Sequence, residues 1–321
     1  MIKAMRQIAN RINPAIIALI LAVVLFLSGG LIRSGFVSYA QAINIVRLAS
    51  FLGIISAGQT IVIIAGGEGI DLSVGAVVTL AAIVVYRFSD GQNALILPVL
   101  GLALAVGAGV GLLNGLGIAF IGIPPLIMTL AMAGVVEGLV LIVTQGQFIG
   151  DVPPAMARYI SSPLFFGIPG VIVLWILLGI AMWVLLERTT FGKHLFAIGV
   201  NRTTARLSGV GVDLTVVLAY TLSGMLAAFG GFAVLAFAQN VFLRLGDRYL
   251  FPSIAAVVVG GTVLAGGKGS YFGTISGALV LTLITSLLTA MQLPEAFRQI
   301  ILGATLLILI SVYGRQRALR E

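Results

Sequence analysis

Residues 49–87 read ASFLGIISAGQTIVIIAGGEGIDLSVGAVVTLAAIVVYR, and this stretch decides the class of fold. Two apolar runs, 49–66 and 72–87, flank a short break at 65–71 that contains three glycines and two carboxylates. About 20 apolar residues cross a bilayer core of roughly 30 Å. The stretch therefore predicts two membrane-spanning helices joined by a glycine-rich polar break.

The rest of the chain has the same character. Of its 321 residues, 60% are apolar and 9% are charged, against roughly 25% charged residues in an average soluble domain. Such a chain cannot build a water-facing surface, so we predict an all-α integral membrane protein. The net charge of +8 does not indicate a nucleic-acid partner, because the basic residues are scattered among apolar runs. A stripe of Gly107, Gly111 and Gly115 predicts close helix packing.

Ten apolar runs are candidates for membrane-spanning helices. They are 14–33, 49–66, 72–87, 94–120, 124–144, 168–187, 213–238, 252–266, 271–290 and 298–314. An even number of crossings places both termini on one side. We read the first run as a retained helix, because no small-residue cleavage site follows it. We therefore expect one transmembrane domain, residues 1–321, in the bacterial inner membrane.

Basic residues indicate which side is cytoplasmic, because such residues concentrate in cytoplasmic loops. On the side of the termini the topology places Lys3, Arg6, Arg11, Arg188, Lys193, Arg202, Arg206, Lys268, Arg315, Arg317 and Arg320. On the other side it places Arg33, Arg47, Arg87, Arg158, Arg244, Arg248 and Arg298. The excess favours cytoplasmic termini.

Two of the predicted spans are short and end in glycines. The break Ala65-Gly66-Gly67-Glu68-Gly69 is echoed by Ala265-Gly266-Gly267-Lys268-Gly269. Six glycines form these breaks: Gly66, Gly67, Gly69, Gly266, Gly267 and Gly269. Paired interrupted helices in two halves point to a transport path, so we predict an internal duplication. The two halves run parallel by the count of spans, or inverted if one short span does not cross.

A few polar side chains lie inside or beside apolar spans and are candidates for the translocation path. They are Gln59, Asp71, Ser73, Asn114, Thr129 and Glu137. Ionisable groups at membrane depth are costly and are functional candidates by default. Asp71 is equally suited to cap the helix that follows it. Glu137 is alternatively a side chain that extends to the outer interface, and the uncharged residues alternatively bond neighbouring helices.

The longest polar segment, 187–213, reads ERTTFGKHLFAIGVNRTTARLSGVGVD. We expect a short basic helix at 203–208, with glycines at 192, 199, 209 and 211 interrupting the chain around it. Such a helix either lies on anionic lipid or inserts its apolar face into a partner protein.

Three stretches in order resemble the ribose-type permeases of bacterial ATP-binding-cassette sugar importers, a family that includes permeases for xylose, arabinose, allose and galactofuranose. They are GIDLSVG at 69–75, the segments TFGK, AIGVN and ARLSG within 190–209, and IAAVVVGGT with AGGKG within 254–269. The similarity covers essentially the whole chain.

The resemblance implies a ten-helix permease that translocates a pentose or hexose and pairs with a second permease chain, identical or related. It implies a periplasmic sugar-binding protein and a separate ATPase subunit that binds ATP and magnesium, so no cofactor is expected here. It also implies that a cytoplasmic loop at about 188–212 couples to the ATPase. The coupling residues would be Phe191, Gly192, Ala197, Gly199, Asn201, Arg202, Ala205, Arg206, Leu207 and Gly209.

This chain departs from that family at two places. Many relatives carry Glu-Leu-Asp where this chain has Leu250-Phe251-Pro252, and many carry an arginine where Glu137 stands. These changes bear on the solute more than on the fold, and they lead to the hypothesis of a solute other than ribose.

Signals for other functions are few. Residues 261–270 lack the G-x-x-x-x-G-K-[ST] pattern of a phosphate loop, because Gly269 follows Lys268. One histidine, no cysteine and dispersed carboxylates argue against a membrane-embedded enzyme. Two further alternatives remain, namely a self-contained secondary transporter and a permease for another solute such as a nucleoside or a branched amino acid.

Overall fold

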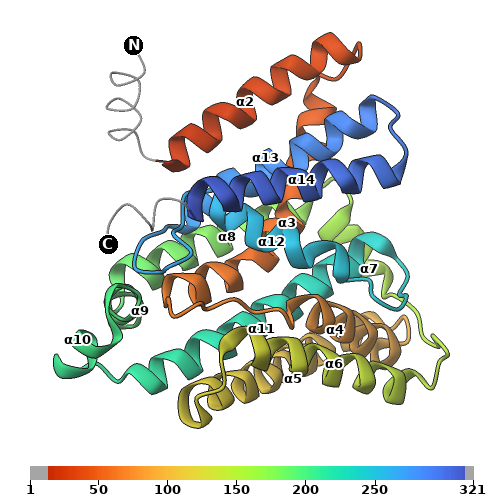
Figure 1. Cartoon of the computed structure of the whole chain (residues 1–321). Helices are drawn as coiled ribbons and strands as arrows, with labels where there is room; N and C mark the ends of the chain where they lie inside the picture. Colours follow the sequence, from red (N-terminus) through yellow and green to blue (C-terminus); the bar gives the residue numbers. More distant parts are fainter. Residues whose placement is uncertain (1–13, 315–321) are drawn as a thin grey trace, which may run out of the picture.

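The computed structural model describes residues 14–314, and its long elements are all helices (Figure 1). In chain order they are α2 (Pro14–Ile32), α3 (Tyr39–Ile64), α4 (Val74–Ser89), η1 (Asn93–Leu95), α5 (Ile96–Leu116), η2 (Gly117–Ile121), α6 (Pro125–Thr144), α7 (Pro154–Met156), η3 (Ala157–Ser161), η4 (Phe165–Gly167), α8 (Gly170–Trp183), η5 (Val184–Arg188), α9 (Thr190–Val200), α10 (Arg202–Leu207), α11 (Val212–Ala238), α12 (Asp247–Val259), α13 (Tyr271–Ala290) and α14 (Glu295–Gly314). The terminal basic residues used to predict orientation, Lys3 to Arg11 and Arg315 to Arg320, lie outside the described residues.

Each of the ten predicted spans overlaps a helix, although the span 252–266 is helical only up to Val259, where α12 ends. Within the described residues, seven helical segments are long and apolar enough to cross a bilayer: α2, α3, η1 to η2, α6, α8 with η5, α11 and α13. Large apolar side chains point outward on these helices, among them Leu31, Leu97 and Ile121. The all-α membrane fold expected from composition is confirmed.

The described chain has two distinct ends, and α9 and α10 mark one of them. In Figure 1 these helices lie at the left, together with the first turn of α2, the loop between α12 and α13, and the last turn of α14. The segment 145–169, which includes α7, lies at the right. We call residues 190–209 the elbow and this end of the bundle the elbow end. The described chain thus begins and finishes at the elbow end.

Helices α4 and α12 are too short to cross alone. At about 1.5 Å per residue, their 16 and 13 residues span roughly 24 and 20 Å. Each is preceded by a loop that enters the bundle, 65–73 from the elbow end and 239–246 from the opposite end. The two helices begin side by side, where the amide of Gly246 donates a hydrogen bond to the Thr79 hydroxyl at 2.9 Å.

The bundle consists of two inverted halves. Helices α3 and α11 are antiparallel, since Gly58 packs against Ser223 and, nearer the opposite end, Phe51 packs against Phe237. In the first half α5 packs against α11 and α4; in the second, α13 packs against α3 and α12. Thus α3, α4 and α5 correspond to α11, α12 and α13. Because α3 and α11 are antiparallel, α11 to α13 form the inverse of α3 to α5.

Two sequence-based interpretations need correction. The glycine breaks at 65–69 and 265–269 are not equivalent positions of a repeat, because the first follows the long helix α3 and the second follows the half-helix α12. Also, α3 is not short: its 26 residues begin at Tyr39. Polar side chains such as Gln41 and Asn44 hid its first turns from the hydropathy pattern.

Candidate functional site

Five of the six predicted path residues meet in one buried network that holds the loop before α4. The Asp71 carboxylate accepts hydrogen bonds from the backbone and hydroxyl of Ser73 at 3.0 and 2.6 Å, and from the Ser223 hydroxyl at 2.8 Å. Gln59 brackets the backbone of Asp71, donating to its carbonyl at 2.6 Å and accepting from its amide at 3.3 Å. Asn114 donates to the Ser73 hydroxyl at 2.9 Å.

The network joins four long helices to one loop. Thr129 of α6 accepts the Leu72 amide at 3.0 Å, while Gln59, Asn114 and Ser223 belong to α3, α5 and α11. Asp71 is fully buried, and a buried carboxylate is tolerated only when donors surround it. Its bonds fix the start of α4 inside the bundle. Most polar atoms of these side chains bond to one another, but the buried Oδ1 of Asn114 has no hydrogen-bond partner. The expected role of these residues as a lining of the path stays a prediction.

The elbow forms because its sequence caps two short helices. The Thr189 hydroxyl accepts the Gly192 amide at 3.1 Å and starts α9, and Asn201 accepts the Thr204 amide at 2.9 Å and starts α10. The predicted basic helix is α10, shifted by one residue. We expected Gly192 and Gly199 to interrupt the chain, but both lie within α9. Each instead allows close packing against the backbone of another segment.

One glycine of the elbow, Gly199, contacts both glycine breaks. A Cβ added to Gly66 would lie 2.9 Å from the Gly199 Cα, and a Cβ added to Gly266 would lie 3.1 Å from the same atom. The Gly267 amide donates to the Ile64 carbonyl at 2.9 Å, and Arg202 donates to the Gly66 carbonyl at 3.4 Å. Three backbone segments, 64–67, 199–202 and 265–267, are therefore in direct contact.

The other face of the elbow is exposed. Leu195, Ile198 and Ala205 are buried under the elbow, whereas Val200 and Leu207 are 74% and 85% exposed. The exposed residues of the predicted coupling set are Ala197, Asn201, Arg202, Arg206, Leu207 and Gly209. Arg206 forms an ion pair with Asp213 at 2.7 Å. This arrangement gives a firmly anchored helix with an exposed apolar and basic face.

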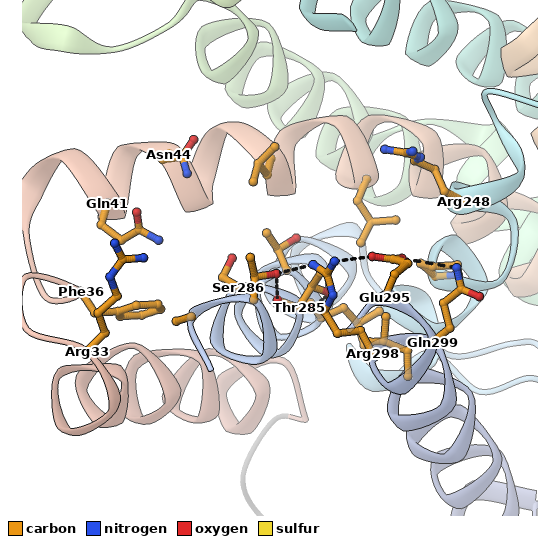
Figure 2. Close-up of a pocket in the computed structure, with 18 of the residues that line it drawn as sticks. Arg33, Phe36, Gln41, Asn44, Arg248, Thr285, Ser286, Glu295, Arg298 and Gln299 are labelled. Carbon is orange, nitrogen blue, oxygen red and sulfur yellow. Dashed lines mark hydrogen bonds and ion pairs between the residues drawn. The ribbon is translucent and has the colours of Figure 1, made fainter. Parts of the chain in front are cut away.

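A large pocket of about 1230 Å³ lies toward the opposite end of the bundle (Figure 2). Polar side chains of α3, α13 and α14 line it, such as Asn44, Thr285 and Gln299, and Arg33 and Arg248 flank it. Arg298 bonds to Glu295 and to the Thr289 hydroxyl within it. Phe251 and Pro252, at one of the departures from the family pattern, are part of its wall.

Glu137 is the sixth predicted path residue and lies apart from the buried network. It lines a smaller cavity of about 260 Å³ at the junction of α4, α6 and the loop before α12. Thr79, Arg244 and Asp247 are the other polar side chains of this cavity.

Sequence reasoning missed Ser223, Thr79, Arg244 and Asp247. Nothing in the sequence distinguishes Ser223 and Thr79 from the other hydroxyl side chains within apolar spans. Arg244 and Asp247 did carry one, as charges just before an apolar span.

Comparison with known proteins shows which proteins this chain resembles. Residues 41–310 match the family model described as branched-chain amino acid transport system / permease component. The autoinducer 2 import system permease protein LsrC of Yersinia enterocolitica is 33% identical over 312 residues, which are 97% of this chain and 85% of that protein. The protein of the same name from Yersinia pseudotuberculosis is 33% identical over 97% of this chain and 87% of its own length. No solved structure matches the chain.

Proposed function

This chain belongs to the family of permease components described as those of the branched-chain amino acid transport system, and we propose that it is the membrane subunit of an ATP-driven importer. The solute that we propose, on the sequence motifs discussed below, is of the monosaccharide type. The observation that supports this most directly is the elbow: α9 and α10 are anchored from below by glycine contacts and expose Val200 and Leu207 on top. An anchored helix with an exposed apolar face is suited to dock into a groove of a partner protein. The partner would be the ATP-binding-cassette subunit, which would hold ATP and magnesium, so this chain itself needs no cofactor and catalyses no reaction.

The elbow end would then face the cytoplasm, with both termini on that side and the large pocket of Figure 2 toward the periplasm. A periplasmic binding protein would deliver the solute there, and a second permease chain would complete the path. Membrane lipid would surround the exposed apolar side chains.

The contacts suggest how docking is transmitted. Gly66 is five residues before Asp71, and its loop is short and internally bonded, with the Gly69 amide donating to the Gly66 carbonyl at 3.1 Å. A displacement of the elbow therefore moves both the loop that starts α4 and the loop that ends α12. Because these half-helices begin side by side at Thr79 and Gly246, their separation would respond to the state of the ATPase. Differential affinity of the ATPase for two such arrangements would drive transport.

The solute is assigned by the resemblance of GIDLSVG and the late glycine motif to sugar permeases. The two Yersinia relatives are named for autoinducer 2 import, so autoinducer 2 is the second solute to test.

The test is purification of the tagged chain from native membranes in mild detergent, with crosslinking and mass spectrometry. We expect an ATPase subunit and a second permease chain in defined ratio. Leu207→Asp should abolish recovery of the ATPase, whereas Met291→Asp, the same kind of change at an exposed residue of the opposite end, should not. Recovery of this chain alone in several detergents, with uptake that stops on addition of a proton uncoupler at constant ATP, would instead favour a secondary transporter.

The solute is tested separately, by competition for uptake in cells that contain the intact system. Neutral pentoses, hexoses and autoinducer 2 compete if the assignment is right. Competition by leucine but by none of these would refute it.

A further inference from the structure

The small cavity at the junction of the two half-helices has the features of a solute site. Its volume of about 260 Å³ lies just below the roughly 300–1,000 Å³ of pockets for drug-sized ligands, so it suits one small molecule. Ala76 and Val140 form apolar walls, and Thr79, Glu137 and Arg244 contribute polar groups. The larger pocket, at about 1230 Å³, is several times greater in volume and fits so small a solute less closely.

Glu137 lies at membrane depth without an ion-pair partner. It is the thirteenth residue of α6, so at 1.5 Å per residue it is about 18 Å from the first residue of that helix and about 10 Å from the last. Within residues 14–314 no basic side chain forms a salt bridge with it. It is exposed on the surface of the chain. A carboxylate facing lipid there is costly, and the small cavity gives Glu137 a polar surrounding beside Thr79, Arg244 and Asp247.

The charges of the cavity discriminate among solutes. Arg244 is paired with Asp247 at 2.8 Å, and their side chains remain 70% and 42% exposed. Because the pair is neutral, Glu137 leaves the cavity with one net negative charge. An anionic solute would be repelled. A neutral solute with adjacent hydroxyls can donate to Glu137 and accept from the remaining guanidinium N–H groups.

We propose that this cavity binds a neutral polyhydroxylated solute during translocation, with Glu137 accepting hydroxyl protons and the Arg244–Asp247 pair contacting a second face of the solute. The proposal rests on the proposed importer function and adds the site and its charge selectivity. The site adjoins the contact between Thr79 and Gly246, so a change in the separation of α4 and α12 would change its shape.

The chain contains no cysteine, which allows a test without background. Leu141→Cys places one thiol in the wall of the cavity, and Ile142→Cys places one on the neighbouring exposed position of α6 outside it. Alkylation by N-ethylmaleimide is followed in the purified permease–ATPase complex. The probes are neutral pentoses and hexoses, autoinducer 2, and the aldonic acids that match the sugars.

We expect at least one neutral sugar to slow the labelling of Leu141→Cys, its aldonic acid not to do so, and neither to affect Ile142→Cys. In the Leu141→Cys background, Glu137→Gln should raise the sugar concentration for half-protection at least tenfold. Asp90→Asn, which removes an exposed carboxylate outside the cavity, should leave it unchanged.

Equal protection by sugar and aldonic acid would overturn the charge selectivity. An unchanged half-protection concentration in Glu137→Gln would overturn the role of Glu137. Absence of protection by every neutral probe, in a complex that retains its ATPase subunit, would overturn the site and leave the importer function standing. Protection by a neutral sugar in a chain that recovers no ATPase subunit would overturn the importer function and leave the site standing.

Discussion

Gly199→Ala is the sharpest test of the coupling route. The new Cβ would overlap the Ile64 carbonyl oxygen and the Gly267 amide nitrogen. Both are backbone atoms, so no side-chain rotation relieves the clash. The same two atoms form the 2.9 Å hydrogen bond that ties the end of α3 to the loop after α12. The substitution therefore separates the elbow from both glycine breaks.

The cost can be bounded from these contacts. Overpacking in a well-packed interior costs about 1–3 kcal/mol, and loss of one buried hydrogen bond about 1 kcal/mol more. A total of roughly 2–4 kcal/mol lowers the fraction of docked elbow by a factor between about 30 and 10³, since 1.4 kcal/mol is tenfold. The cost is local, so we expect the helices to insert and the chain to accumulate.

The assay is uptake per ATP hydrolysed in proteoliposomes containing the full complex. Gly199→Ala should hydrolyse ATP with little uptake, or lose the ATPase subunit on purification. Gly211→Ala is the matched control, because a Cβ at Gly211 meets no atom within 4 Å. A normal ratio of uptake to hydrolysis in Gly199→Ala would refute the route through the three glycine segments.

Three further substitutions test other parts of the structure. Asp71→Ala leaves buried donors without an acceptor, so we expect the free energy of unfolding to fall by about 2–4 kcal/mol and the thermal transition in detergent to fall by several degrees. Asp71→Asn should lose much less stability. Equal transition temperatures for the two variants would contradict this. Arg206→Glu places a like charge beside Asp213. Because exposed ion pairs contribute at most about 1 kcal/mol, the stability of the chain should hardly change, while its stimulation of the ATPase falls. Unchanged transport and unchanged stimulation would exclude this face from docking. Gly266→Val places a branched side chain at φ +93° against the Gly66 backbone, so transport should be lost; normal transport by a stably assembled variant would contradict the contact.

Much of the fold could be predicted from the sequence because lipid imposes one strong rule. Every backbone polar group in the bilayer must be bonded internally, so apolar runs become helices, and each of the ten runs contains one. The elbow helix was also predictable, because Asn201 and the glycines after it act over a few residues and need no distant partner.

The depth of each loop could not be predicted in this way. Hydropathy alone does not distinguish a helix that starts at the surface from one that starts inside, as α4 does. What sets that depth is the bonding of Asp71 to Ser223, 152 residues later in the chain. For the same reason five polar residues scattered over 59–129 gave no sign that they form one network rather than five separate contacts.

The echo between AGGEG and AGGKG therefore has a different cause from duplication. In the inverted halves, the loop equivalent to 65–73 is 239–246, which has no such glycine pair. The two glycine breaks are alike because they share one neighbour: Gly66 and Gly266 both approach the Cα of Gly199, where any side chain would collide with backbone. Each also has a positive φ, at +69° and +93°, which glycine adopts without strain. Sequence similarity at non-equivalent positions can thus mark a shared contact. Here that contact joins the elbow to both half-helices, which is what a docking site must do if it is to move a path that lies deep in the membrane.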